Sequence, residues 1–328
     1  MILSSEISFW IALTQIPRWG NVKVNTLLQM IFEKEKIGLE DFFSRSVQEW
    51  KEKFGLSEVD CENFTAAKNE LPNYSFIAED LLSQGFEIIP ITSSDYSSTL
   101  KENLNPLNAP PLLYIKGNKK ILQESSLAIV GSRDASEISL QFTDKIARLA
   151  SKQYKVVVSG FAKGVDKQAL DSSLKYKGQS IIVLPQGIST FGSGITKYYS
   201  QIIEGDVLVL STFFPKSPWS VQLAMARNPI IYGLAKEIYV AESGNEGGTW
   251  SGVLDGLRKK RNIFVRKPEA IEKNANNILI QKGAIAVDFD GNSIPFQYEE
   301  IEQKQLVFAE PKNISKETKY PQQENLFK

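Results

Sequence analysis

Histidine is absent from the 328 residues of this chain, and cysteine occurs once, as Cys61. Without an imidazole the chain cannot build a Ser-His-Asp or Cys-His catalytic centre, and it cannot ligate a metal through histidine. A single cysteine allows no disulfide within the chain and no multi-cysteine zinc site. We therefore expect no bound metal and no cofactor. The scarcity of cysteine is consistent with a reducing cytosol.

Long apolar runs and an excess of one charge are missing as well. No run approaches the ~20 apolar residues that a membrane helix needs. The N-terminal segment MILSSEISFWIAL lacks a basic start and is interrupted by Glu6, so a signal peptide is not expected. Lys and Arg total 38, and so do Asp and Glu, so the net charge is zero. We expect a cytoplasmic protein without membrane contact, in which any basic surface is a local patch.

The apolar pattern divides the chain into three parts. Residues 1–72 have helical spacing, with one apolar stripe beginning at Ile7 and another at Val24, and predict a small helical domain. Residues 73–270 predict an α/β domain with a Rossmann-like, doubly wound, mainly parallel sheet. Residues 271–328 are polar and predict a partly disordered C-terminal extension, with a tight hairpin turn at 288–291.

Short runs rich in Val, Ile and Leu alternate with amphipathic stretches from residue 126 onward, as in parallel strands buried on both faces. The expected strands are Leu127–Val130, Val156–Ser159, Ile181–Leu184, Val207–Leu210, Ile238–Ala241 and Ile263–Val265, preceded by Glu87–Ile91 and Leu112–Lys116. The expected helices span residues 137–152, 165–177, 196–204, 219–234 and 249–260.

Three local signals refine these elements. Pro90 favours a sheet edge for the first strand, because proline cannot donate a ladder hydrogen bond. Asp134 and Glu137 have capping-box spacing at the start of the helix over 137–152. Pro229 predicts a kink or break in the helix over 219–234, which would aim Arg227 at the sheet edge.

Four glycine-rich loops follow predicted strands and would meet at the carboxyl edge of the sheet. They span residues 131–133, 159–164, 187–194 and 243–249. Glycine lets the backbone approach a phosphate, and the following helix N-terminus directs N–H groups at it. The alternative is that tight strand-to-helix turns need glycine for their own geometry. The P-loop pattern GxxxxGKS/T and the pattern GxGxxG are both absent, so ATP hydrolysis is not expected and a nicotinamide cofactor is disfavoured.

Arg133 and Lys163 each lie inside one of these loops, a placement that suits anion binding. The alternative is a solvated or structurally paired cation. Asp166 begins a predicted helix, where a carboxylate favours the helix dipole or braces the loop. Aromatic residues near the same edge would stack nucleic-acid bases or pack within the fold; they are Phe161, Phe191 and Tyr199.

The stretches LAIVGSR, VVVSGFAKGVDKQAL, RNPIIYGLAKEIYVAE and SGNEGGTWSG occur in this order. Together they resemble the DNA-processing family DprA (Smf), a branch of the Rossmann-like SLOG superfamily. IPRWGNVKVNTLL resembles that family's N-terminal helix-hairpin-helix or SAM-like region. The resemblance implies a protein that binds single-stranded DNA without catalysis. It also implies protection of incoming strands in natural transformation, help in loading the recombinase RecA, and a homodimer.

The loops and the resemblance together define a candidate site for phosphate and nucleic acid. Its members are Gly131, Ser132, Arg133, Ser159, Gly160, Lys163, Gly164, Asp166, Arg227, Asn228, Gly247, Gly248 and Thr249. Lys163 stands where the family usually has arginine. Leu170 replaces a histidine of the family pattern, and Pro229 replaces the last cation of its RNR motif.

A different function remains open on the same fold: binding or hydrolysis of a nucleotide-derived small molecule. GGTW resembles the end of the phosphoribohydrolase motif PGGxGTxxE, but Gly252 occupies the position of the catalytic glutamate. Glu242 and Glu246 are nearby carboxylates whose placement does not match that motif. We therefore expect no enzyme activity.

The C-terminal segment QENLF, Gln323–Phe327, resembles the sliding-clamp peptide QLxLF. Leu326 and Phe327 would fill an apolar pocket of the clamp, and a flexible polar tether is a natural carrier for such a peptide. The alternative is a polar tail that ends in two apolar residues by chance.

Overall fold

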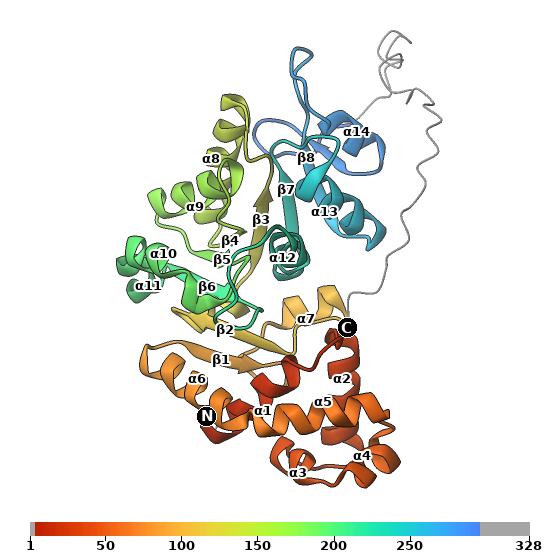
Figure 1. Cartoon of the computed structure of the whole chain (residues 1–328). Coiled ribbons are helices and arrows are strands. Elements are labelled where there is room, and N and C mark those ends of the chain that lie inside the picture. Colours follow the sequence, from red (N-terminus) through yellow and green to blue (C-terminus); the bar gives the residue numbers. More distant parts are fainter. Residues whose placement is uncertain (1–3, 296–328) are drawn as a thin grey trace, which may run out of the picture. The chain divides into compact units, whose positions relative to one another are not determined.

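In the computed structural model, which describes residues 4–295, nine strands form one sheet in the order β1-β2-β6-β5-β4-β3-β7-β8-β9 (Figure 1). The strands are β1 Glu87–Pro90, β2 Leu112–Lys116, β3 Ser126–Val130, β4 Val156–Ser159, β5 Ser180–Val183, β6 Val207–Ser211, β7 Glu237–Val240, β8 Asn262–Arg266 and β9 Ile285–Val287. Strands β3 to β9 pair in parallel, whereas β1 and β2 are antiparallel additions at one edge. The expected doubly wound α/β fold is confirmed, and Pro90 lies on the edge strand.

Helices cover both faces of the parallel strands. The helices are α1 Ser4–Thr14, α2 Asn21–Gln29, α3 Leu39–Ser44, α4 Val47–Phe54, α5 Glu58–Asn69, α6 Leu71–Ser83, α7 Ser98–Leu104, α8 Glu137–Lys152, α9 Val165–Lys175, α10 Gly192–Lys197, α11 Tyr199–Glu204, α12 Val221–Leu234, α13 Gly247–Arg258 and α14 Asn276–Gln281. Figure 1 shows α8 and α9 on one side of β3, with α12 and α13 on the other. This arrangement follows from right-handed crossovers that run outward from β3 in both directions.

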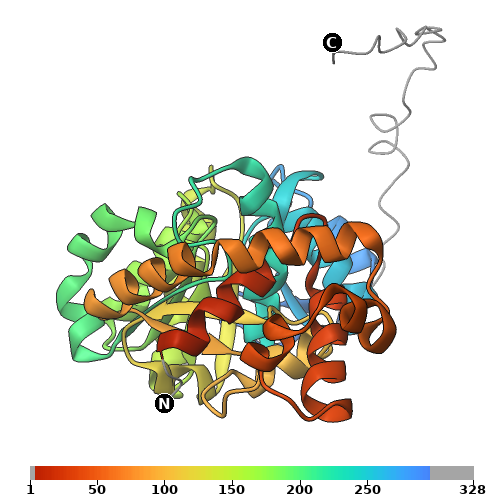
Figure 2. The ribbon, with the colours of Figure 1, turned by 60° about the horizontal axis from the view of Figure 1, so that its bottom comes forward.

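The N-terminal helices pack around aromatic side chains. Phe42 lies edge-on to Phe64, with ring centroids 5.3 Å apart, and Trp50 donates its indole N–H to the Phe42 carbonyl at 2.9 Å. Ser46 and Glu49 form a capping box that starts α4. Helix α1 packs along α6 (Figure 2) and also contacts β2. The described residues up to Ile294 therefore form one compact unit.

Two helices and a strand lie at the domain limits drawn from the sequence. The limit at residue 72 falls at the start of α6, because Pro72 occupies the first turn of this helix, where its missing N–H does no harm. The limit at residue 270 falls before α14 and β9, which extend the same sheet; Val287 of β9 is fully buried in the core beside Phe142. The turn at 288–291 forms, with the Gly291 N–H donating to the Asp288 carbonyl at 3.1 Å.

Three local expectations differ from the structure. Of the expected kink or break at Pro229, the break does not occur, because α12 continues through this residue. The segment over 196–204 forms two short helices, α10 and α11. The capping box between Asp134 and Glu137 does not form, because Glu242 from the loop after β7 takes the start of α8 instead. Within the described residues, no helix has the length and apolar character to cross a membrane.

Candidate nucleic-acid interface

The loops after β3 and β7 meet at the point where the strand order reverses. Strand β3 lies between β4 and β7, and the chain returns from β6 to β7 through α12. In doubly wound sheets this switch point opens the crevice in which ligands bind. The two loops are joined by hydrogen bonds: the Ser132 N–H donates to the Glu242 carbonyl at 2.9 Å, and the Thr249 hydroxyl donates to the Gly131 carbonyl at 3.1 Å.

The loop after β4 packs directly onto the loop after β3. The Val165 N–H donates to the Ser132 carbonyl at 3.2 Å. Gly164 has φ +80°, and a Cβ there would lie 2.4 Å from the Ser132 carbonyl oxygen and 2.5 Å from that of Arg133. Glycine at this position is therefore required by loop packing, as the alternative interpretation held. This close packing brings Arg133 and Lys163 to one surface.

Arg133 and Lys163 are the accessible cations of this edge. Arg133 is exposed, and among the described residues it forms no ion pair. Lys163 donates to the Asp134 carboxylate at 3.0 Å, yet 81% of its side chain remains exposed. Exposed pairs of this kind are worth about 0–1 kcal/mol. A phosphate can therefore compete for Lys163 at small cost.

Arg227 lies at the same edge but is buried, with only 4% of its surface exposed. Its guanidinium packs against Gly160, where a Cβ would come within 1.4 Å of Nη1. Nη1 is 3.7 Å from the Asp166 carboxylate. Burial raises the pKa of Asp166 despite the neighbouring Arg227, and burial likewise lowers the pKa of Arg227. Arg227 thus lies at the sheet edge, as expected. However, it extends from an unbroken helix, and it is buried.

Two adjoining hollows open between these loops, and we name them the outer cleft and the inner pocket. The outer cleft, about 540 Å³, is lined by Arg133, Lys163, Phe161, Phe191 and Trp219 among others. The inner pocket, about 450 Å³, lies at the switch point between the loops after β3 and β7 and the middle of α12. Four residues line both hollows and form their shared wall: Arg133, Ala162, Ala224 and Arg227.

The aromatic residues of this edge divide into packed and accessible ones. Phe161 has φ +60°, unusual for a bulky residue, and its ring lies edge-on to Phe191 with centroids 4.9 Å apart. Phe191 is 7% exposed, so it packs within the fold. Tyr199 is exposed but does not line the outer cleft. Trp219, which the sequence analysis missed, is 51% exposed and lines it.

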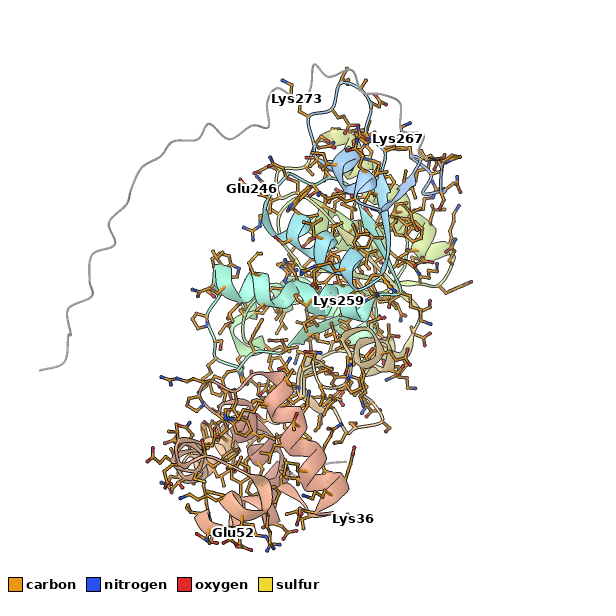
Figure 3. All side chains as sticks on the ribbon, turned by 90° about the vertical axis from the view of Figure 1, so that its right-hand side faces the viewer. Lys36, Glu52, Glu246, Lys259, Lys267 and Lys273 are labelled. Carbon is orange, nitrogen blue, oxygen red and sulfur yellow. The ribbon has the colours of Figure 1, made fainter. Side chains whose placement is uncertain are left out.

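Of the two glutamates in the loop after β7, Glu242 has a structural role and Glu246 is exposed. Glu242 accepts hydrogen bonds from the Ser136 N–H at 3.0 Å and from the hydroxyls of Ser136 and Ser139 at 2.6 and 2.7 Å. A carboxylate at this position stabilises the positive end of α8. Glu246 is exposed and precedes α13; Figure 3 shows Glu246 and Lys259 at the two ends of that helix.

The remaining predicted site residues have the following contacts and positions. Ser159 donates its hydroxyl to the Asp166 carbonyl at 3.2 Å and is buried. The Asn228 amide approaches the Gly248 carbonyl at 3.5 Å, and Gly247 begins α13. Leu170 is fully buried in α9, where an apolar side chain fits. Within residues 4–295, no group of three or more Asp, Glu or Cys side chains is arranged to hold a metal ion.

These features define a doubly wound α/β protein whose cationic, glycine-rich loops gather at the switch point of the sheet. Residues 87–294 match the family described as DNA recombination-mediator protein A. This match covers more than half of the chain, and the chain belongs to this family.

Two relatives and one solved structure of the same family match most of this chain. The DNA processing protein DprA of Streptococcus pneumoniae is 30% identical over 220 residues, 65% of this chain and 76% of that protein. DprA of Bacillus subtilis is 26% identical over 253 residues, 75% of this chain and 83% of that protein. The X-ray structure of the S. pneumoniae protein matches with a TM-score of 0.68 at 25% identity, over 87% of this chain and 95% of that one.

A second structure shares the fold. DNA processing protein A of Helicobacter pylori, described for its single-stranded DNA binding mode, matches with a TM-score of 0.52 at 24% identity. The match covers 61% of this chain and 90% of that one.

Proposed function

We propose that this chain binds single-stranded DNA in the outer cleft and acts in DNA processing. The observation that carries the proposal is the convergence of Arg133, Lys163 and an accessible Trp219 on one cleft at the carboxyl edge of the sheet. Membership of the DNA recombination-mediator protein A family supports it.

The cleft combines the two kinds of contact that single strands need. Exposed cations neutralise phosphates without reading sequence. An exposed aromatic face stacks on any of the bases, and each stacked base contributes about 1–3 kcal/mol to the binding free energy. Trp219 offers such a face, and Phe161 lies in the same cleft with its ring half-buried. A duplex hides its base faces, so this pairing of contacts favours single strands.

Charge reversal tests the proposal. Arg133→Glu with Lys163→Glu should weaken binding of a fluorescent oligo-dT by about tenfold or more, because each charge-assisted contact is worth roughly 1–3 kcal/mol. The matched control is Lys36→Glu with Lys259→Glu, which changes the net charge equally at two exposed lysines that do not line the cleft. Figure 3 labels both residues. Unchanged affinity in a folded cleft variant would remove the cleft as the site.

We further propose that the protein acts in the cytoplasm, protects bound strands and helps to load RecA, as a homodimer. Sedimentation of the purified protein tests the dimer, and RecA filament growth on strands coated with a single-strand-binding protein tests loading. A stimulation of filament growth that disappears with the cleft variant supports the loading role.

The clamp peptide at Gln323–Phe327 lies outside the described residues. It stays a proposal, which titration of a labelled 320–328 peptide with a bacterial clamp would test.

Binding without catalysis is also part of the proposal. Glu242 is engaged at the start of α8, and Gly252 stands where a phosphoribohydrolase would need its glutamate. Glu246 is the remaining carboxylate of that loop. Turnover of ATP, DNA or nucleoside monophosphates that is lost in Glu246→Gln would overturn the proposal.

A further inference from the structure

The inner pocket is lined by two buried polar side chains, each with one polar atom that has no hydrogen-bond partner among the described residues. Within residues 4–295, the Nε of Arg227 and the hydroxyl of Tyr232 are buried without a hydrogen-bond partner. Both side chains line the inner pocket, and they are 4% and 7% exposed. A buried donor nitrogen without a hydrogen-bond partner is costly, and here the Arg227 Nε lacks one within the described part of the chain, although Nη1 lies 3.7 Å from Asp166. This pair therefore points to a ligand that accepts hydrogen bonds.

The start of α13 faces the same pocket. Gly247, Gly248 and Thr249 open this 12-residue helix and line the pocket, and the preceding Glu246 makes no side-chain cap. Their N–H groups belong to the first turn, which has no partners within the helix. Gly247 has φ +89°, and no atom lies within 4 Å of where its Cβ would be. The backbone at this helix start is thus open to a ligand, and its dipole favours an anion.

The pocket carries charges of both signs, and its two arginines are the groups that can hold a phosphate. Arg227 and Arg133 line it as cations, and Asp134, Asp166 and Glu246 line it as carboxylates. Asp166 is the close neighbour of Arg227, and Asp134 pairs with Lys163 outside the pocket. A terminal phosphomonoester carries more negative charge than an internal diester, about −1.5 to −2 at neutral pH. It therefore gains more from Arg227, Arg133 and the helix start together.

The pocket also has the size and access that a nucleotide needs. Its volume of about 450 Å³ lies within the usual range for small-ligand sites. It shares a wall with the outer cleft through Arg133, Ala162, Ala224 and Arg227. A strand that lies in the cleft would therefore reach the pocket with its end. Val221 and Met225, both exposed apolar side chains, line the pocket and offer a surface for the base.

We propose that the inner pocket binds a nucleoside monophosphate group: the phosphorylated terminal nucleotide of a single strand held in the outer cleft. Its phosphate accepts hydrogen bonds from Arg227, from the Tyr232 hydroxyl and from the first N–H groups of α13. This inference rests on the proposed function, because the strand is held by the cleft. A free mononucleotide presents the same chemistry and is the competing source.

Strands that differ only at their ends test the inference. Internally labelled oligo-dT is prepared with 5′-phosphate, with 3′-phosphate and with hydroxyls at both ends, and affinity is measured by fluorescence anisotropy. We expect one phosphorylated end to bind at least about fivefold tighter than the hydroxyl strand, as for one charge-assisted hydrogen bond. Thymidine monophosphate and thymidine are titrated separately by thermal shift.

Two variants assign the effect to the pocket. Tyr232→Phe removes only the hydroxyl, and Arg227→Lys keeps the charge but removes the forked donor. Both should reduce the preference for a phosphorylated end. Tyr232→Phe should also leave the hydroxyl strand bound as before, because Tyr232 does not line the outer cleft. Tyr154→Phe is the matched control, since it removes a hydroxyl that is exposed at the turn after α8. Circular dichroism checks that each variant folds, and Tyr232→Phe remains informative if Arg227→Lys does not.

The results of these experiments distinguish a strand end from a free nucleotide in the pocket, and both from a failure of the proposed function. A preference for one phosphorylated end that falls in Tyr232→Phe supports the terminal nucleotide. Stabilisation by thymidine monophosphate but not thymidine, without any end preference, assigns the pocket to a free nucleotide instead and contradicts the strand-end proposal. Equal binding of all strands with no response to the mononucleotide overturns the inference but leaves the proposed function standing. If no strand binds at all, the proposed function fails.

Discussion

In the proposed binding mode, Asp134 competes with the phosphate backbone for Lys163. Its carboxylate lies 3.0 Å from the lysine Nζ, and both side chains are more than four-fifths exposed. The ion pair must separate before Lys163 can bind a phosphate, and Asp134 also repels the strand.

Asp134→Asn should therefore tighten oligo-dT binding by about two- to fivefold, the range of an exposed ion pair. Asp290→Asn is the matched control, because Asp290 pairs with Lys145 away from the cleft and the net charge changes equally. Weaker binding by Asp134→Asn would show that Asp134 orders the loop rather than competing with the ligand.

The absence of a side chain at Gly160 leaves room for the Arg227 guanidinium. A Cβ at residue 160 would lie 1.4 Å from Nη1 and 2.2 Å from Cζ, so Gly160→Ala must displace this buried group. We expect a loss of about 1–3 kcal/mol in the free energy of unfolding, typical of overpacking. Urea denaturation measures it. Gly192→Ala, where no atom lies within 4 Å, should stay within about 0.5 kcal/mol, and equal losses in the two variants would contradict the packing role.

At the scale of elements, Asp60 joins the segment before α2 to the start of α5. Its carboxylate accepts hydrogen bonds from the Trp19 indole, the Lys23 ammonium and the Ser57 hydroxyl, each at 2.7 Å. Burial would raise the pKa of Asp60, but the hydrogen bonds from Lys23, Ser57 and Trp19 outweigh it and lower that pKa to about 2. Because the folded-state pKa is depressed, the ionised Asp60 stabilises the fold above its unfolded pKa of 3.8, and this contribution is lost as pH falls toward 2.

Asp60→Asn should lower the free energy of unfolding at pH 7 by about 1–2 kcal/mol. The difference from the unmodified protein should shrink as pH falls from about 4 toward 2, where the native carboxyl also becomes protonated. Denaturation curves across this range measure it, with the exposed Asp80→Asn as control. A difference that is constant with pH would exclude the ionised carboxylate as its origin.

The elements that sequence reasoning found are those with strong local patterns. Arg133 and Lys163 could be placed together because parallel strands end at one edge, a consequence of topology alone. The burial of Arg227 depends on how α12 crosses β4, which no local pattern encodes. Likewise Glu242 replaces the expected cap of α8 from a distance of more than 100 residues in sequence. Strand β9 has three residues, too few for a periodic signal.

Trp219 illustrates a signal that was available but unused. It follows Pro218 in the loop after a buried strand, β6, and the carboxyl ends of parallel strands share an edge. A large aromatic in such a loop is a candidate for an accessible contact. The same edge rule that grouped the glycine loops predicts its place.

For the whole molecule, the net charge of zero means that DNA affinity cannot come from general attraction. The affinity that we propose must therefore come from local contacts, and in the outer cleft Arg133 and Lys163 are the exposed cations. Each phosphate contact on a single strand releases counterions and contributes about −0.7 to the slope of log K against log salt. The slope therefore counts the contacts that the cleft makes.

The salt slope of oligo-dT binding, measured for the unmodified protein and for Arg133→Ala with Lys163→Ala, tests the cleft most directly. If each side chain neutralises one phosphate, we expect the double variant to bind more weakly, with a slope less negative by about 1.4. A folded double variant that binds with unchanged affinity and an unchanged slope would contradict the assignment of the DNA-binding site to this edge of the sheet.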